Sequence, residues 1–289
     1  MRTAIFYFSG TGNTKKVVDV WLSSLNSLGI YADIFSVEKE NTFDLGEYDK
    51  IGFAYPIHAF NAPEIMLEFA KKLPASGKPL PAYVIMVSGE PLRLNDSSDR
   101  KLRKILKGKN IAVESSWHYI MPYNMIFHHT EENAFRMYET VKNLVPVDAY
   151  EYFVLGKNHV MKTIPGTGPI TSAFRIEQWF SHRNGKMFSV RGDCIRCMKC
   201  VSDCPRGNIS VKNGKITFSG DCILCTRCSF SCPKGAISIG LLDFWKVNGP
   251  YKFRKPEKRE EDRHSGYCKG SYARYFREAE ERIANAAVR

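Results

Sequence analysis

Apolar and polar positions alternate in blocks along the first half of the chain. Short apolar runs predict buried strands at residues 3–8, 30–37, 50–55, 81–87 and 110–116. Apolar residues at helical spacing predict helices at residues 13–28, 63–73, 99–107 and 131–144. Strands that alternate with helices are typical of a doubly wound parallel sheet, so we expect an α/β fold.

The pattern changes in the second half of the chain. Residues 145–187 have no clear periodicity, and residues 188–240 are rich in cysteine. Residues 241–289 are basic, with a helix expected only from about Ser271. We therefore divide the chain into a domain at residues 1–160, a connection of unpredicted structure at 161–187, a small domain at 188–240 and a partly helical tail at 241–289.

The composition is that of an ordinary globular protein. The 289 residues are 44% hydrophobic and 25% charged, which excludes general disorder. No apolar run approaches the roughly 18 residues that a membrane span needs. The first residues lead straight into a glycine-rich turn and have no export signal. We expect a cytoplasmic protein that does not enter a membrane.

Eight of the nine cysteines lie between Cys194 and Cys232, in two copies of one pattern. Residues 193–211 and 221–239 align without gaps at an offset of 28 residues, with ten identical positions. Each copy reads Cys-x-x-Cys-x-x-Cys-x-x-x-Cys-Pro, a spacing of iron–sulfur ligands. Disulfides are disfavoured because there is no export signal. Zinc would need only paired Cys-x-x-Cys and would leave the third cysteine of each run unexplained.

The two runs resemble those of two-cluster bacterial ferredoxins, across about residues 188–240. The resemblance implies a small α+β domain with two 4Fe–4S clusters, in which the fourth cysteine of each run binds the other cluster. It implies two sets of ligands. These are Cys194, Cys197, Cys200 and Cys232 for cluster one, and Cys222, Cys225, Cys228 and Cys204 for cluster two. Asn213-Gly214 is a hairpin turn signal that fits this small domain.

A glycine-rich loop joins the first predicted strand to the first helix. It reads Ser9-Gly10-Thr11-Gly12-Asn13-Thr14. Backbone N–H groups and hydroxyls at a helix N-terminus form a site for a phosphate. The loop lacks the lysine of a Walker loop and the spacing of the dinucleotide fingerprint, which suits a terminal monophosphate. Taken alone, it could also be an ordinary polar turn.

The loop and its place after the first strand resemble the phosphate loop of flavodoxins, over about residues 1–150. This resemblance implies FMN, with the loops after the third and fourth strands beside the flavin ring. Residues 89–95 lack the aromatic residue that often stacks there, so His58, Phe60 or residues 121–124 are expected to cover the ring. The FMN contacts expected are Ser9, Gly10, Thr11, Gly12, Asn13, Thr14, Pro56, Ile57, His58, Ala59, Phe60, Asn61, Ser88, Gly89 and Glu90.

The formal charge of +12 first suggests nucleic acid. Each oxidised cube with its four thiolates carries about −2, and the FMN phosphate offsets more, so nucleic acid is not the expected partner. Residues 240–289 hold twelve basic and eight acidic residues. This tail could dock an acidic redox partner or form a solvated helix.

Other residues of the sequence give weaker evidence for a functional site. No histidine pair has metal-binding spacing on a helix, no hydrolase motif is present, and Cys268 is expected to be a free thiol. The whole chain resembles the flavodoxin–ferredoxin fusion proteins found mostly in anaerobes. That resemblance implies an electron carrier with no catalytic side chain. The alternatives are an FMN-dependent reductase of a quinone, nitro compound or oxygen species, and a redox sensor whose tail binds nucleic acid.

Overall fold

A computed structural model describes residues 1–39, 42–161, 166–174, 176–257 and 269–287 of the chain. Five strands form one parallel sheet in the order β2-β1-β3-β4-β5. The strands are β1 (Arg2–Tyr7), β2 (Tyr31–Ser36), β3 (Lys50–Pro56), β4 (Leu80–Ser88) and β5 (Ile111–Ile120). The order reverses between β1 and β3, which is the switch point where doubly wound sheets bind ligands. The predicted α/β fold is confirmed.

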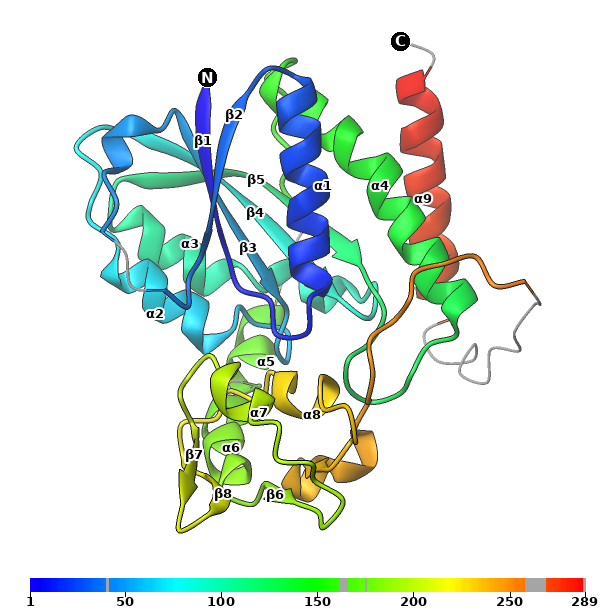
Figure 1. Cartoon of the computed structure of the whole chain (residues 1–289). Helices are drawn as coiled ribbons and strands as arrows, with labels where there is room; N and C mark the ends of the chain where they lie inside the picture. The colour runs from blue at the N-terminus through cyan, green and yellow to red at the C-terminus, as the bar shows by residue number, and fades with distance from the viewer. Residues whose placement is uncertain (40–41, 162–165, 175, 258–268, 288–289) are drawn as a thin grey trace.

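Helices cover both faces of the sheet (Figure 1). The helices α1 (Asn13–Ser27) and α4 (Glu131–Phe153) pack on one face, and α2 (Glu64–Lys72) and α3 (Arg100–Lys107) pack on the other. Neighbouring residues of a strand point to opposite faces. Accordingly, Ile5 of β1 belongs to the core under α1 and α4, whereas Phe6 belongs to the core under α2 and α3.

Helix α4 is nine residues longer than the sequence pattern predicted. The added residues include Pro146, and proline lacks the backbone N–H of a helical hydrogen bond. The helix continues through Pro146 because Val145, Ala149 and Tyr152 keep packing against the sheet. Tertiary burial therefore outweighs the local preference. Strand β5 likewise runs four residues past its predicted end, to Ile120.

The connection and the tail, for which the sequence predicted little, also form helices. Residues of the connection form α5 (Thr167–Ala173) and α6 (Ile176–Gly185). The tail ends in α9 (Lys269–Ala287), which lies along α4 and buries Phe276 and Ala279 (Figure 1). The tail helix is thus partly buried against the first domain. Cys268 lies outside the described residues.

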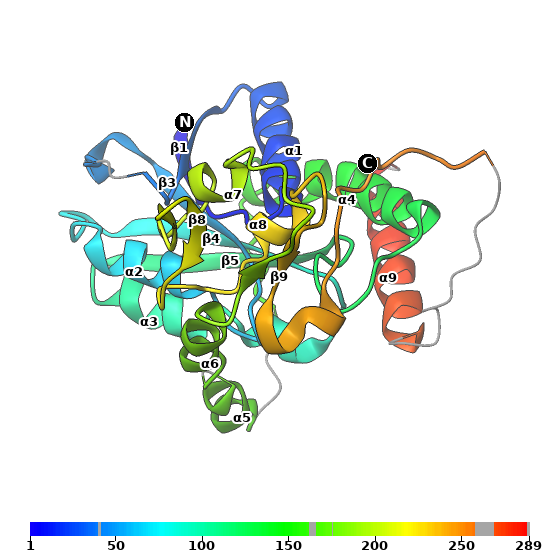
Figure 2. The ribbon, with the colours of Figure 1, turned by 60° about the horizontal axis from the view of Figure 1, so that its bottom comes forward.

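The cysteine-rich domain lies at the carboxyl edge of the parallel sheet (Figures 1 and 2). Its strands are β6 (Ser189–Val190), β7 (Ile209–Lys212), β8 (Lys215–Phe218) and β9 (Ile237–Ser238). Its helices are α7 (Lys199–Ser202) and α8 (Arg227–Phe230). Three 3₁₀ turns lie elsewhere in the described residues: η1 (Leu45–Glu47), η2 (Arg93–Ser97) and η3 (Gly240–Trp245). Strands β7 and β8 form the predicted hairpin, with Asn213 and Gly214 both at positive φ.

Candidate functional site

A cavity of about 630 Å³ opens between the carboxyl edge of the sheet and the cysteine-rich domain. Its size is within the range of roughly 300–1,000 Å³ that small-molecule sites have. Thirteen of the fifteen predicted FMN contacts line it. They are Ser9, Gly10, Thr11, Asn13, Thr14, Pro56, Ile57, His58, Ala59, Phe60, Ser88, Gly89 and Glu90.

The glycine-rich loop presents the start of α1 to this cavity. Gly12 is the N-cap of α1, with φ at 102°. It has no side chain that could accept hydrogen bonds from the backbone N–H groups of the helix. Ser9 Oγ accepts a hydrogen bond from Lys15 N at 3.2 Å. The remaining N–H groups of the first turn have no side-chain acceptor from the cap, which is the arrangement that binds phosphate. Gly12 itself does not line the cavity.

The loop after β3 is a tight turn that aims His58 and Phe60 at the cavity. Ala59 and Phe60 have φ values of 42° and 63°, and His58 and Asn61 exchange two backbone hydrogen bonds of 2.9 Å. The Asn61 side chain donates to the carbonyls of Ala59 and of Thr171 in α5, and Asn61 does not line the cavity. Burial lowers the pKa of His58, which favours the neutral imidazole.

The loop after β4 is held by a side-chain network. Ser88 Oγ lies 2.7 Å from His118 Nε2, and His118 Nδ1 lies 3.0 Å from Asp96 Oδ1. A Cβ added at Gly89 would stand 2.5 Å from the Tyr123 ring, so only glycine fits there. Tyr272 of α9 donates a hydrogen bond to the Gly89 carbonyl. The tail helix therefore supports a loop of the cavity.

Aromatic side chains form the rest of the wall. Among the predicted cover residues, His58, Phe60 and residues 121–124 all line the cavity. Trp179 and Phe174 of the connection and Trp245 of η3 also line the cavity, and none of them was predicted from the sequence. Aromatic residues clustered in a segment without clear periodicity were the available signal. The wall fits the flat, largely apolar ring of a flavin, and the loop at the start of α1 fits its phosphate.

The two cysteine runs have the same backbone geometry. Arg196 and Met198 have positive φ in the first run, and Leu224 and Thr226 have positive φ at the equivalent positions of the second. The amide of Arg196 donates to Cys194 Sγ and that of Leu224 to Cys222 Sγ, both at 3.4 Å. Left-handed conformations at non-glycine residues are costly and cluster at functional sites. Here they wind each run so that its thiols face inward.

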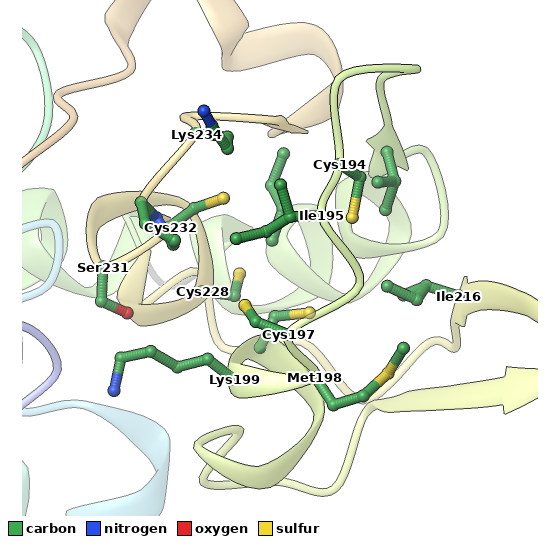
Figure 3. A pocket seen from close by; sticks show the side chains of 14 residues that line it. Cys194, Ile195, Cys197, Met198, Lys199, Ile216, Cys228, Ser231, Cys232 and Lys234 are labelled. Atoms are coloured by element: carbon green, nitrogen blue, oxygen red, sulfur yellow. The ribbon is translucent and has the colours of Figure 1, made fainter.

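Five thiols from both runs line one pocket. Figure 3 shows Cys194 and Cys197 of the first run with Cys228 and Cys232 of the second, and Cys200 lines the same pocket. Burial raises the pKa of the Cys200 thiol, and the charges of Cys194, Cys197 and Cys232 raise it further. Cys200 and these three are the ligands that the resemblance implies for cluster one, and Cys228 belongs to the other set.

The other four thiols form a second group that is more buried. Burial raises the pKa of Cys222 to about 12 and that of Cys225 to about 11, with nearby Cys204 adding to both. Burial and the same three neighbours raise the pKa of Cys228. Among the described residues, no three His, Cys, Asp or Glu side chains are placed to hold a single metal ion. A cube binds its thiolates on four separate irons, so such a tight group is not required.

The second group adjoins the cavity of the first domain. Cys225 lines that cavity together with Leu224 and Thr226. Gly10 of the glycine-rich loop meets this segment directly, because a Cβ added there would stand 2.7 Å from the Cys225 carbonyl oxygen. The two predicted cofactor sites therefore share a wall.

Comparison with known families found a match within each domain. Residues 4–112 match the model of a flavodoxin domain, and residues 193–237 match that of a 4Fe-4S dicluster domain. A flavodoxin from Streptococcus pneumonia TIGR4 is 18% identical over 49% of this chain and 96% of its own, with a TM-score of 0.36. Flavodoxin 2 from Bacillus cereus is 14% identical over 53% and 99%, with a TM-score of 0.40. A comparison with curated proteins found no match.

The two family matches support an FMN and iron–sulfur redox protein. None of the helices within the described residues has both the length and the apolar composition needed to cross a membrane.

Proposed function

We propose that this chain, a fusion of a flavodoxin domain with a 4Fe–4S dicluster domain, relays electrons between FMN and two 4Fe–4S clusters, to or from a protein partner. FMN can exchange two electrons or one, whereas each cube passes one at a time. Each step between FMN and a cube would move a single electron from donor to acceptor. The chain would thus connect two-electron and one-electron chemistry.

One observation carries this proposal: the glycine-rich loop and Cys225 line the same cavity. If FMN binds at the loop, its site and that of cluster two are separated by no other protein layer at this wall. The grouping of the thiols supports two cubes with the ligand sets implied by the resemblance. Cys194, Cys197, Cys200 and Cys232 would hold cluster one, and Cys222, Cys225, Cys228 and Cys204 would hold cluster two.

The surface around cluster one supports an acidic protein as the partner. Cys197 is exposed, and the side chain of Ile195 beside it is 56% exposed. Arg196, Lys199 and Lys234 are exposed nearby. An apolar centre with basic residues around it favours a partner with acidic residues around its own redox centre. Binding should therefore weaken as the salt concentration rises.

A second candidate function is reduction of a small molecule at the flavin. The observation that favours it is the exposed aromatic wall, because Trp179 is 56% and Trp245 is 39% exposed beside the cavity. A flat quinone or nitroaromatic compound could stack there. Turnover that saturates with such a compound would favour the reductase. Rapid electron exchange with protein partners alone would favour the carrier.

The proposed relay is tested on anaerobically purified protein. We expect about eight irons and eight sulfides, from two four-iron cubes, with one FMN per chain. Stepwise reduction should bleach flavin and cluster absorbance in coupled steps. Iron without FMN, or FMN whose reduction state never affects the clusters, would contradict the proposal.

A further inference from the structure

We propose that Arg227 is the positioning residue that fixes the flavin phosphate loop against the ligands of cluster two, which makes cluster two the electron-exchange partner of FMN. This inference rests on the proposed function. It adds the order of the redox centres, in which cluster two lies next to FMN and cluster one lies on the far side of cluster two. Arg227 begins α8 and lies between Cys225 and Cys228 in the sequence. Its guanidinium is mostly buried, with 19% of the side chain exposed.

All five N–H donors of Arg227 are used, and four of them reach the flavodoxin domain. Nε donates to the Gly10 carbonyl at 2.9 Å, and one Nη2 hydrogen donates to the Ser9 carbonyl at 2.8 Å. The other Nη2 hydrogen and one Nη1 hydrogen form a bidentate pair with Glu38, at 2.5 and 2.7 Å. The second Nη1 hydrogen donates to the Asp203 carbonyl, just before Cys204, at 2.8 Å.

The guanidinium fork explains why this contact is specific. A planar arginine presents five donors in fixed directions, whereas lysine presents three donors around a point charge. A lysine at position 227 would keep the charge near Glu38 but could not bind two loop carbonyls and a carboxylate in one plane. We therefore expect the geometry of the fork, and not the charge alone, to hold the loop.

The contact between Gly10 and Cys225 is a second, independent observation. Gly10 has no positive φ, so backbone conformation does not require glycine there. Space does, because a Cβ at position 10 would lie 2.7 Å from the Cys225 carbonyl oxygen and 3.2 Å from Cys225 Cβ. A glycine in the phosphate loop thus allows the backbone of a cluster ligand to come into direct contact with it.

Arg206 provides a matched control. It is a second arginine of the cysteine-rich domain that pairs with the flavodoxin domain, through Glu68 of α2, and it also donates to Asp221 at 2.8 Å. Its side chain is 18% exposed, close to the value for Arg227. It contacts neither the phosphate loop nor the FMN cavity. A variant at Arg206 weakens the domain interface and leaves the loop in place.

The experiment compares Arg227→Met, Arg227→Lys and Arg206→Met with the unchanged protein, each purified anaerobically with its clusters. The readouts are iron content, the FMN dissociation constant, and the rate at which cluster absorbance responds after photoreduction of the flavin. Because both loop carbonyls lose their donors, we expect about tenfold weaker FMN binding and about tenfold slower exchange in Arg227→Met. Arg227→Lys should restore little, and Arg206→Met should behave like the unchanged protein.

The inference is overturned if Arg227→Met and Arg206→Met lose the same amount of FMN affinity and exchange rate. It is also overturned if Arg227→Lys restores the full FMN affinity and exchange rate. If the Arg227 variants lose their iron, Gly10→Ala becomes the test, because it separates loop and ligand without removing a charge. Gly10→Ala should then show the same losses, and unchanged exchange would overturn the inference. If exchange is absent from the unchanged protein, it is the proposed relay that fails, whatever the variants do.

Discussion

The tail helix packs on the first domain, and a buried ion pair between the two allows a quantitative prediction. Arg282 Nη2 of α9 lies 2.6 Å from Asp148 Oδ1 and 2.7 Å from Glu151 Oε2 of α4, and the Asp148 side chain is completely buried. Asp148 also accepts a hydrogen bond from Tyr119 at 2.6 Å. Replacing Arg282 by methionine leaves the carboxylate buried without its cation.

The expected cost comes from the burial of each partner. Removing one partner of a fully buried pair costs about 3–5 kcal/mol. Arg282 is 31% exposed and Tyr119 keeps its hydrogen bond to Asp148, so water and the Tyr119 hydroxyl reduce the expected loss of stability. We therefore expect Arg282→Met to lower the free energy of unfolding by about 2–3 kcal/mol. On the same helix, Arg277 is 68% exposed in its pair with Glu281, and Arg277→Met should change stability by less than about 0.5 kcal/mol.

The assay is equilibrium urea unfolding of each variant, repeated between pH 7 and pH 5. Burial raises the pKa of Asp148, so the native protein binds this proton more tightly than the unfolded chain does. Stability from such a group increases as the pH falls toward the raised pKa. The deficit of Arg282→Met should therefore shrink on acidification. The double variant Asp148→Asn with Arg282→Met should be more stable than Arg282→Met alone at pH 7, and equal stability there would refute the reasoning.

Three further predictions follow from single contacts. Gly52→Ala should destabilise the sheet by about 1–3 kcal/mol, because its Cβ would lie 2.5 Å from the buried Tyr83 ring; unchanged urea unfolding would contradict this. Pro146→Ala should stabilise the protein by about 1–2 kcal/mol in the same assay, because alanine restores a backbone N–H inside α4 at a small entropic cost in the unfolded chain. Cys197→Ser and Cys225→Ser should each remove about four irons per chain, measured by iron analysis. Only Cys225→Ser should also alter flavin fluorescence, since Cys225 alone of the two lines the cavity proposed to hold FMN; equal flavin spectra would count against the shared wall.

Much of the fold could be predicted because buried parallel strands appear in the sequence as short apolar runs. The five apolar runs became the five strands, with most ends within one or two residues. The family matches confirm the order of the two domains. The predictions failed where long-range packing decides, as at Pro146, where core contacts carry α4 past a helix-breaking residue.

The candidate site could likewise be predicted only where a short motif in the sequence defines it. The glycine-rich loop and the cysteine runs are motifs whose spacing encodes chemistry, and the structure brings their residues to two adjoining sites. The sequence could not predict Trp179 or Arg227, because their roles depend on neighbours from distant segments. Nothing in the run around Arg227 indicates which loop its guanidinium contacts.

Arg227 has a counterpart in the other copy of the repeat, because Lys199 stands 28 residues before it at the same position. Lys199 is exposed and pairs with Asp203 of its own domain, whereas Arg227 directs four of its five N–H donors to the other domain. If the repeat arose by duplication, we expect its two copies to be under unequal selection. We expect the copy that faces water to be free to diversify and acquire new partners, while the copy beside the flavin is held to its ancestral role.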